Sequence, residues 1–224
     1  MLNIVIPMAG RGSRFANAGY KDPKPLIDVA GAPMIMRVTR NLKPKCAHRF
    51  IYICQKSHLE QYPLEEELRK EEQDCIIIPI DHITEGAACT VLLAKKYINN
   101  QDQLMIANSD QYVDIDINDY LAGLAQFDGL IMTMPANDPK WSFIKYDENK
   151  LVTLVREKEV ISNEATVGIY NYLHGSDFVY YAEKMIESGK KIAFYDIGPK
   201  MHGLGTPEDL TLFLKTFELA KLKS

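Results

Sequence analysis

Glycine and basic residues cluster directly after the first apolar segment of the chain. The stretch PMAGRGSRF follows residues 2–6, LNIVI, a β-prone segment in which every residue is apolar except one asparagine. Gly10 and Gly12 let the backbone approach a ligand closely and turn its N–H groups toward an anion. Arg11 and Arg14 can add charge to phosphate oxygens. The segment therefore predicts a phosphate-binding loop.

Two common phosphate-loop patterns do not fit this segment. A dinucleotide-binding turn requires G-x-G-x-x-G/A, but Phe15 occupies the third small-residue position, and the Walker pattern G-x-x-x-x-G-K-[ST] is absent. The alternative to a phosphate-binding loop is a tight strand-to-helix loop whose arginines are merely exposed and bind no ligand. A second segment weakens that alternative, because prolines on both sides of Lys24 restrict its backbone and can hold its charge at a fixed position.

Short apolar segments alternate with amphipathic stretches through the first two-thirds of the chain. We expect strands at residues 2–6, 50–54, 75–79, 104–107 and 130–134, and helices at residues 34–42, 59–71, 87–98 and 117–126. This alternation predicts a mainly parallel sheet flanked by helices, with right-handed crossovers. Ligands bind beyond the carboxyl ends of the strands in such a sheet. The turns leaving the first and fourth strands should therefore converge on one site.

The pattern changes after about residue 140. We expect strands at residues 143–146, 151–155, 166–173 and 191–195, joined in part by short turns, and helices at residues 175–188 and 207–222. The last helix has Thr206 as its N-cap, Pro207 at its first position, and Glu208 and Asp209 in its first turn. The whole chain, residues 1–224, therefore predicts one α/β domain with an antiparallel C-terminal portion.

Composition excludes several classes of function. The 224 residues carry a net charge of −4, with 46% hydrophobic and 25% charged residues. Mild acidity argues against nucleic acid as a partner, because duplex binding requires clustered basic charge. Four cysteines without a CxxC pair favour a reduced, cytoplasmic compartment. The first apolar segment is too short for a signal peptide or a membrane span, so we expect no membrane partner.

The two N-terminal motifs, GRGSRF and DPKPLIDVAGAPMI, together resemble the signature of the sugar nucleotidyltransferases, also called nucleoside-diphosphate-sugar pyrophosphorylases. Further matching segments follow in the same order along nearly the whole chain: EGAA, NSD, REK, TVGIY and GLGTPEDL. The short capsule- and cell-surface-polysaccharide branch is the most similar. The resemblance implies a Rossmann-like (GT-A-like) domain in which residues 1–140 mainly bind nucleotide and residues 141–224 mainly bind sugar phosphate.

The resemblance also implies a reaction and its residues. An NTP, with a pyrimidine base (CTP, dTTP or UTP) favoured, and a phosphorylated sugar or polyol would give a nucleotide-linked sugar and pyrophosphate, with Mg²⁺ as cofactor and a homo-oligomer possible. The implied catalytic residues are Arg14, Lys24 and Asp110, and Asp110 is also the implied magnesium ligand. The implied nucleotide-binding residues are Met8, Ala9, Gly10, Gly12, Ser13, Arg14, Lys24, Glu85, Gly86, Ala87, Asn108 and Ser109. The implied sugar-phosphate-binding residues are Trp141, Glu157, Lys158 and Gly168.

One position departs from the family pattern. Gly203 stands where the family usually has a second metal-binding aspartate. Either Asp196 or Asp209 compensates, or Asp110 and the nucleotide phosphates hold the metal without a second carboxylate, which Mg²⁺ tolerates. For the neighbouring His202 we favour a structural or surface role.

Two other functions remain open at this stage. A glycosyltransferase would use a similar nucleotide-binding sheet but consume a nucleotide-sugar, and the cationic groups suited to a triphosphate argue against it. A non-catalytic nucleotide sensor is motivated by the missing aspartate at position 203.

Overall fold

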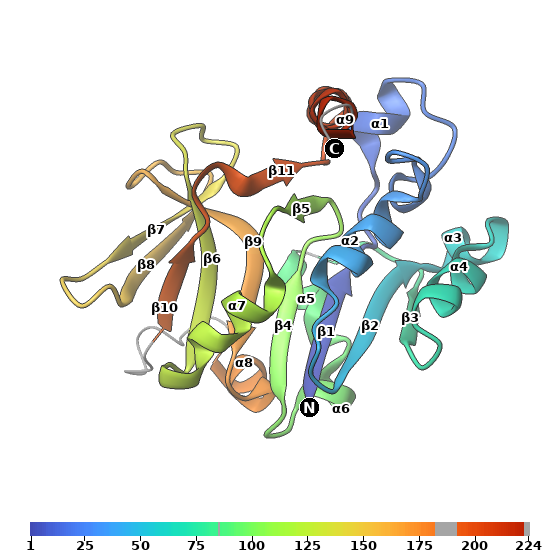
Figure 1. The fold of residues 1–224 in the computed structure, drawn as a ribbon. Coiled ribbons are helices and arrows are strands. Elements are labelled where there is room, and N and C mark those ends of the chain that lie inside the picture. The colour runs from blue at the N-terminus through green and yellow to red at the C-terminus, as the bar shows by residue number, and fades with distance from the viewer. Residues whose placement is uncertain (85, 182–191, 222–224) are drawn as a thin grey trace.

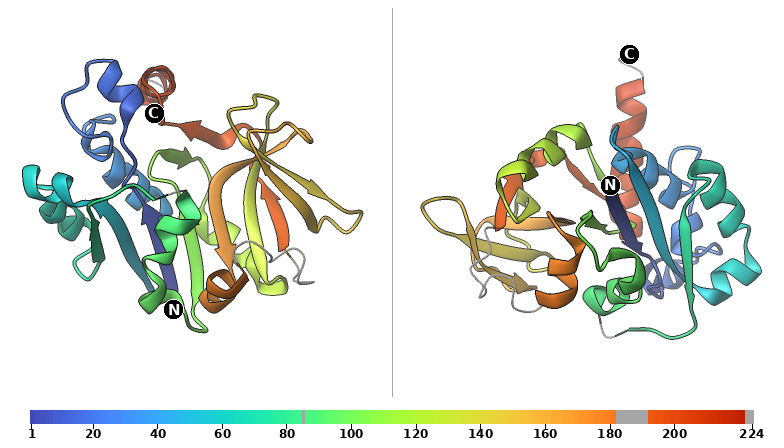
Figure 2. Two further views of the ribbon diagram at one scale, coloured as in Figure 1. Left: turned by 180° about the vertical axis from the view of Figure 1, so that it is seen from behind. Right: turned by 90° about the horizontal axis from the view of Figure 1, so that it is seen from below.

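The computed structural model describes residues 1–84, 86–181 and 192–221, and these form a mixed sheet with helices on both faces (Figures 1 and 2). The described strands of the main sheet run in the order β10-β6-β9-β4-β1-β2-β3, with β7 joined to β9 and β8 joined to β7. Their bounds are β1 (Leu2–Pro7), β2 (His48–Gln55), β3 (Ile76–Ile80), β4 (Gln103–Ala107), β6 (Gly129–Pro135), β7 (Ser142–Tyr146), β8 (Val152–Glu157), β9 (Glu164–Tyr172) and β10 (Ile192–Asp196).

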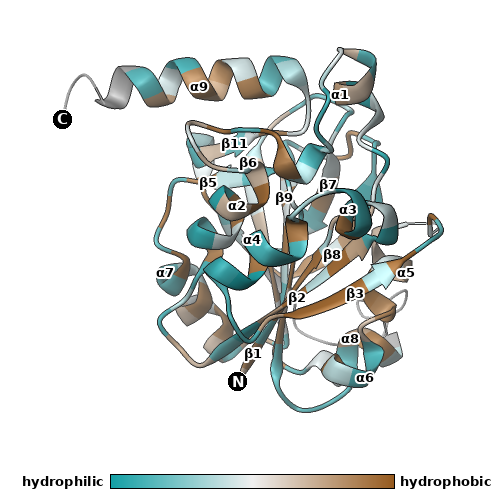
Figure 3. Ribbon diagram, turned by 90° about the vertical axis from the view of Figure 1, so that its right-hand side faces the viewer, coloured by the Kyte–Doolittle hydropathy of each residue, from teal (hydrophilic) through white to brown (hydrophobic). Residues whose placement is uncertain are grey.

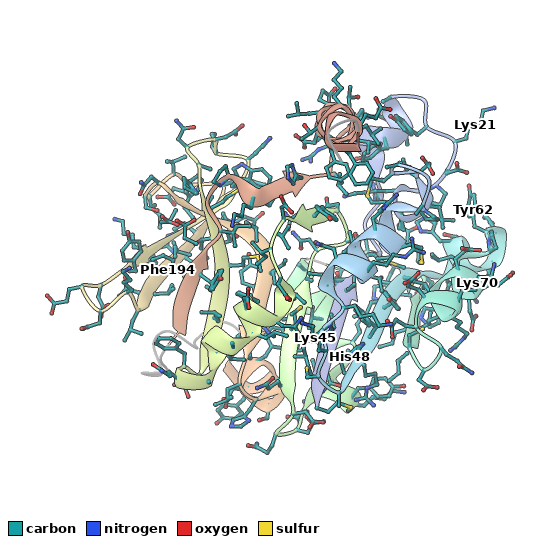
Figure 4. All side chains as sticks on the ribbon, in the orientation of Figure 1. Lys21, Lys45, His48, Tyr62, Lys70 and Phe194 are labelled. Carbon is teal, nitrogen blue, oxygen red and sulfur yellow. The ribbon has the colours of Figure 1, made fainter. Side chains whose placement is uncertain are left out.

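The direction of the strands confirms the expected fold class. Strands β4, β1, β2 and β3 pair in parallel, whereas β9 lies antiparallel between β4 and β6. Strands β7 and β8 form an antiparallel hairpin, and the centre of its Tyr146 ring lies 4.5 Å from the centre of the Phe194 ring of β10. Figure 4 labels Phe194 on this side of the sheet. The chain is thus a Rossmann-like α/β domain with an antiparallel portion after residue 140.

Helices cover both faces because the central strands carry buried residues, most of them apolar, on both sides of the sheet. The described helices are α1 (Ser13–Asn17), α2 (Met34–Leu42), α3 (Lys56–Gln61), α4 (Leu64–Glu71), α5 (Ala87–Leu92), α6 (Lys95–Ile98), α7 (Ile117–Ala122), α8 (Gly175–Tyr181) and α9 (Pro207–Lys221). Ile4 faces α2, α4 and α7, while Val5 faces α5, α6 and α8. The strands β2 and β3 are largely brown in Figure 3, and the outer surfaces of α3 and α4 are largely teal.

Three expected helices are shorter than predicted. Residues 59–71 form two helices, because Pro63 forces Tyr62 into an extended conformation (φ −133°, ψ 156°). Residues 87–98 divide into α5 and α6, and residues 117–126 divide into α7 and a 3₁₀ turn, Gly123–Gln126. The helix expected at residues 175–188 is α8 as far as Tyr181, and its remainder lies outside the described residues.

The C-terminal helix begins as predicted. The Thr206 hydroxyl oxygen accepts a hydrogen bond from the Asp209 backbone N–H at 3.1 Å, so Thr206 is the N-cap of α9. Two short strands that the sequence did not indicate, β5 (Gln111–Val113) and β11 (Met201–Gly203), pair with each other just before this helix. No helix in the described part of the chain has the length and apolar character needed to cross a membrane.

Candidate active site

The loop after β1 packs against Lys24 through a glycine. Gly12 has a left-handed backbone (φ 61°), and a Cβ at this position would lie 3.2 Å from the Lys24 Cβ. The Gly12 carbonyl accepts the N–H groups of Phe15 and Ala16, which begins α1. Phe15 is buried beside Leu204, so α1 is fixed to the segment that precedes α9. A glycine is therefore required for the loop to approach Lys24 this closely.

Lys24 and Asp110 form an ion pair. Lys24 begins a 3₁₀ turn (Lys24–Leu26), and Asp110 follows the end of β4. The two side chains are 21% and 22% exposed, so both lie in a recess that water still reaches. The recess is a cavity of about 250 Å³, and the loops that follow β1 and β4 form part of its wall. Its lining residues are Pro7, Met8, Gly10, Gly12, Lys24, Pro25, Asn108, Ser109 and Asp110. The turns leaving β1 and β4 converge here.

A second cavity of about 260 Å³ continues from the first, because both contain Pro7, Gly10 and Asn108. Its other lining residues are Ala9, Ile80, Ile83, Thr84, Gly86, Ala87 and Thr90. The Gln55 side-chain amide donates to the carbonyls of Ala9 and Gly10, at 2.9 and 3.1 Å, and so fixes the loop at this cavity. Glu85, which the sequence also places here, lies outside the described residues.

The structure does not bring Arg14 into contact with Lys24 and Asp110. Arg14 and Ser13 lie exposed on α1, outside the lining of both cavities, and within the described residues the Arg14 side chain has no hydrogen bond or ion pair. Arg11 lines a different, larger cavity of about 670 Å³ beside Lys56 and residues 80–83. The role of Arg14 therefore stays a prediction that depends on movement of an exposed side chain.

The residues expected to bind sugar phosphate lie in two places. Lys158 pairs with Glu157 at 3.0 Å, and both side chains are exposed, at 69% and 75%. The Lys158 backbone N–H donates to the Trp141 carbonyl at 3.0 Å, which joins these two predicted residues. Gly168 lies instead against Asn108, whose N–H donates to the Gly168 carbonyl at 3.0 Å.

Gly168 is required by this close approach. Its backbone is left-handed (φ 79°), and a Cβ would lie 2.1 Å from the Asn108 Nδ2 and 2.5 Å from the Gln111 Oε1. Gly168 therefore packs against Asn108, which lines the first cavity, and its contact with the sugar phosphate stays a prediction.

Trp141 lines a third cavity, of about 280 Å³, beyond the end of β6. Its other lining residues are Met134, Pro135, Ala136, Met201, His202, Gly203, Asp209, Leu212 and Phe213. Of these, Asp209 was considered from the sequence only as a possible metal ligand, and His202 was given a structural or surface role. Sequence position gave only a partial signal for them, because both neighbour the variant segment at Gly203.

The pairing of β5 with β11, which the sequence did not indicate, places Gly205 against Asp110. The Leu204 N–H donates to the Asp110 carbonyl at 2.7 Å, and a Cβ on Gly205 would lie 2.7 Å from the Asp110 Oδ2. Three-residue strands have too few alternating residues to be recognised from sequence, so Gly205 was not singled out.

One carboxylate lies beside Gly203, the position where the family usually has a second metal-binding aspartate. A Cβ on Gly203 would lie 3.5 Å from the Asp209 carboxylate, whereas the Asp196 carboxylate accepts the Gly198 N–H at 2.7 Å. Asp209, and not Asp196, is therefore the acid beside the variant position. In the described ranges, no group of three or more His, Cys, Asp or Glu side chains could hold a metal. The donor set that Asp110 offers still fits Mg²⁺, which binds one or two carboxylates together with substrate phosphates and water.

Comparison with known proteins identifies the family. The nucleotidyl transferase family model matches residues 4–202, so the chain belongs to that family of enzymes. Mannose-1-phosphate guanylyltransferase catalytic subunit beta of Drosophila melanogaster is 27% identical over 179 residues, which cover 74% of this chain and 47% of that protein. The chain thus spans about half the length of the curated relatives it matches.

Solved structures show the same fold. A nucleoside-diphosphate-sugar pyrophosphorylase from Vibrio cholerae RC9 has a TM-score of 0.77 at 24% identity, covering 95% of this chain and 99% of that one. An inositol-1-phosphate CTP transferase from T. maritima has a TM-score of 0.74 at 13% identity, covering 96% of each chain. These matches agree with the resemblance to sugar nucleotidyltransferases, and the capsule branch stays an expectation.

Proposed function

We propose that this chain transfers a nucleotidyl group from an NTP to a phosphorylated sugar or polyol and releases pyrophosphate. The observation that carries the proposal is the paired Lys24 and Asp110 in a cavity walled by the glycine loop after β1. The relatives support the class of acceptor, because their names specify mannose 1-phosphate and inositol 1-phosphate.

The chemistry needs positioning and charge, and no general base. An oxygen of the acceptor phosphate, already an anion at pH 7, attacks the α-phosphorus. The new P–O bond forms as the bond to the β-phosphate oxygen breaks, and the electron pair leaves with pyrophosphate. The backbone N–H groups of Gly10 and Gly12 bind the triphosphate, and Arg14 binds its β- and γ-oxygens. Lys24 exchanges its carboxylate partner for the α-phosphate and stabilises the charge that develops there.

Asp110 is the residue that would hold Mg²⁺. The bound ion would neutralise charge on the phosphate oxygens. Lys158 would bind the acceptor phosphate, which its exposed ammonium can reach from the turn after β8.

The base and the setting are finer parts of the proposal. The preference for a pyrimidine nucleotide comes from the resemblance, and we propose that the base occupies the second cavity, which is about 260 Å³ in volume and lined mostly by small and apolar residues. The compartment we propose is the cytoplasm, where four cysteines without disulfides would stay reduced. The nucleotide-sugar would serve capsule or surface-polysaccharide synthesis.

Pyrophosphate release tests the proposal. CTP, UTP, dTTP, GTP and ATP are each combined with glucose 1-phosphate, mannose 1-phosphate, ribitol 5-phosphate and inositol 1-phosphate in the presence of Mg²⁺. We expect release with a pyrimidine nucleotide and at least one acceptor. Calorimetric NTP binding without release from any pair would favour the nucleotide sensor. Consumption of UDP-glucose without pyrophosphate would favour the glycosyltransferase.

A further inference from the structure

The cavity that contains Trp141 also contains a carboxylate and further aromatic rings. We propose that Asp209 is a specificity-determining residue that accepts hydrogen bonds from the hydroxyl groups of the acceptor, and that Gly203 gives those hydroxyls access to it. The proposal rests on the proposed function, since it concerns the sugar or polyol part of the same acceptor.

The position of the cavity links it to both ends of the reaction. On one side, the Trp141 backbone carbonyl accepts the backbone N–H of Lys158, the residue proposed to bind the acceptor phosphate. On the other side, Gly203 pairs with Gln111, the residue after Asp110. An acceptor whose phosphate lies between Lys158 and the nucleotide would therefore extend its remaining atoms toward this cavity.

Two glycines near the end of β11 each lie against a carboxylate. A Cβ on Gly203 would lie 3.5 Å from the Asp209 carboxylate, and a Cβ on Gly205 would lie 2.7 Å from the Asp110 carboxylate. Leu204, between them, is fully buried in the cluster with Phe15. Gly203 and Asp209 both line the cavity, so the absence of a side chain at Gly203 leaves space in front of the Asp209 carboxylate.

The lining of the cavity suits a polyhydroxylated ligand. The rings of Trp141, His202 and Phe213 provide surfaces for C–H groups, and the His202 and Phe213 rings lie 5.6 Å apart. The ionised carboxylate of Asp209 is an acceptor only, with room for several hydroxyl donors, and such charge-assisted bonds are about twice as strong as neutral ones.

Lys140 holds Asp209 in this place. Its ammonium lies 3.7 Å from the Asp209 Oδ1 and 4.9 Å from the centre of the Trp141 ring. The carboxylate is therefore directed toward the same corner as the indole. Asp209 is also 26% exposed, so a ligand can reach it.

If Asp209 only stabilised helix α9, substitutions of Asp209 and of its neighbour Glu208 should have similar effects. Asp209 lies in the first turn of α9 together with Glu208, and a carboxylate there stabilises the helix through its dipole. Glu208 is exposed and outside the cavity lining. The substitution Glu208→Gln removes the same charge from the same helix turn, and is therefore a matched control for Asp209→Asn.

Tryptophan fluorescence tests the proposal without catalysis. Trp141 is the single tryptophan of the chain, so its emission reports directly on the cavity. The protein is titrated with glucose 1-phosphate, mannose 1-phosphate and ribitol 5-phosphate, and separately with inorganic phosphate and with CTP alone. We expect at least one sugar or polyol phosphate to change the emission while inorganic phosphate does not.

In Asp209→Asn, the concentration for half-maximal change should rise about 10-fold or more, while Glu208→Gln should bind like wild type. Gly203→Val, whose methyl groups would fill the entrance, should also weaken this binding and leave the calorimetric affinity for CTP unchanged. Wild-type binding by Asp209→Asn, an equal response to inorganic phosphate, or no response to any of the three compounds would overturn the proposal. Pyrophosphate release by wild type alongside any of these results would leave the proposed function standing.

Discussion

A methyl group on Gly205 should displace the carboxylate of Asp110. The Cβ of Gly205→Ala would lie 2.7 Å from the Asp110 Oδ2, while ordinary contact begins at 3.4 Å. The carboxylate must therefore move by about 0.7 Å from its present position in the ion pair with Lys24. Because a 1 Å misplacement in an active site can cost about 10²-fold in rate, we expect kcat to fall by roughly 10- to 100-fold.

Stability should change little in the same variant. The Lys24–Asp110 pair opens to solvent in its cavity, so its loss should cost no more than about 1 kcal/mol. For a chain of this length that is a Tm change of roughly 2–4 °C. Gly123→Ala serves as the control, because its Cβ would meet Leu130 at an ordinary 3.4 Å and Gly123 lines none of the three site cavities.

Pyrophosphate release and thermal unfolding are measured together on both variants. A wild-type kcat for Gly205→Ala would refute the placement of Asp110 in the reaction centre. A large fall in Tm with no folded protein at 25 °C would instead show that the segment is structural. Gly123→Ala should match wild type in both measurements.

The other predictions concern charge. Lys24→Ala and Arg14→Ala should each lower kcat on the order of 10²-fold with Tm within a few degrees of wild type, and normal turnover by both would remove them from catalysis. Lys158→Ala should mainly raise the KM for the acceptor, so an unchanged KM would exclude it from the site. Burial, and secondarily the charge of Asp196, raises the pKa of Glu164. A raised pKa in the folded state means that stability is fully present below the unfolded pKa of about 4.3 and is lost as pH rises through the folded value. Glu164→Gln should therefore have a higher Tm than wild type at pH 7 and none of that advantage near pH 4, measured by thermal unfolding across this range.

Periodicity and loop position predicted most of the fold and the centre of the site. The meeting of Lys24 with Asp110 followed from one rule, that loops after parallel strands share an edge of the sheet. The same rule could not place Arg14, because a long exposed side chain on a five-residue helix has many positions. Pro63 could have divided the helix expected at residues 59–71, since the residue before a proline avoids helical backbone.

Contacts between distant segments could not be predicted from pattern. Strands β5 and β11 have three residues each, and their pairing depends on the path of the chain between residues 113 and 201. That pairing puts Gly205 against Asp110 and Gly203 against Asp209. From the sequence, the glycine at position 203 was only a missing aspartate, with two carboxylates as equal substitutes. In the structure, Gly203 lies beside the Asp209 carboxylate, whereas the Asp196 carboxylate accepts a hydrogen bond from the Gly198 backbone N–H.

The antiparallel strand β9 brings the two parts of the proposed site together on one sheet. It pairs with β4 only from Tyr172 back to Ile169, where β4 ends at Ala107. The part of β9 before Gly168 therefore continues past the edge where the loops of β1 and β4 meet, and there it pairs with the end of β6 and with β7. Strand β7 begins directly after Trp141, and its partner β8 ends directly before Lys158. A parallel strand in the place of β9 would end level with β4 and would carry no hairpin past this edge. The reversal of one strand thus puts the hairpin that we propose to bind the acceptor beside the loops that we propose to bind the nucleotide, so under the proposed function the change of pattern after residue 140 serves the site as well as the fold.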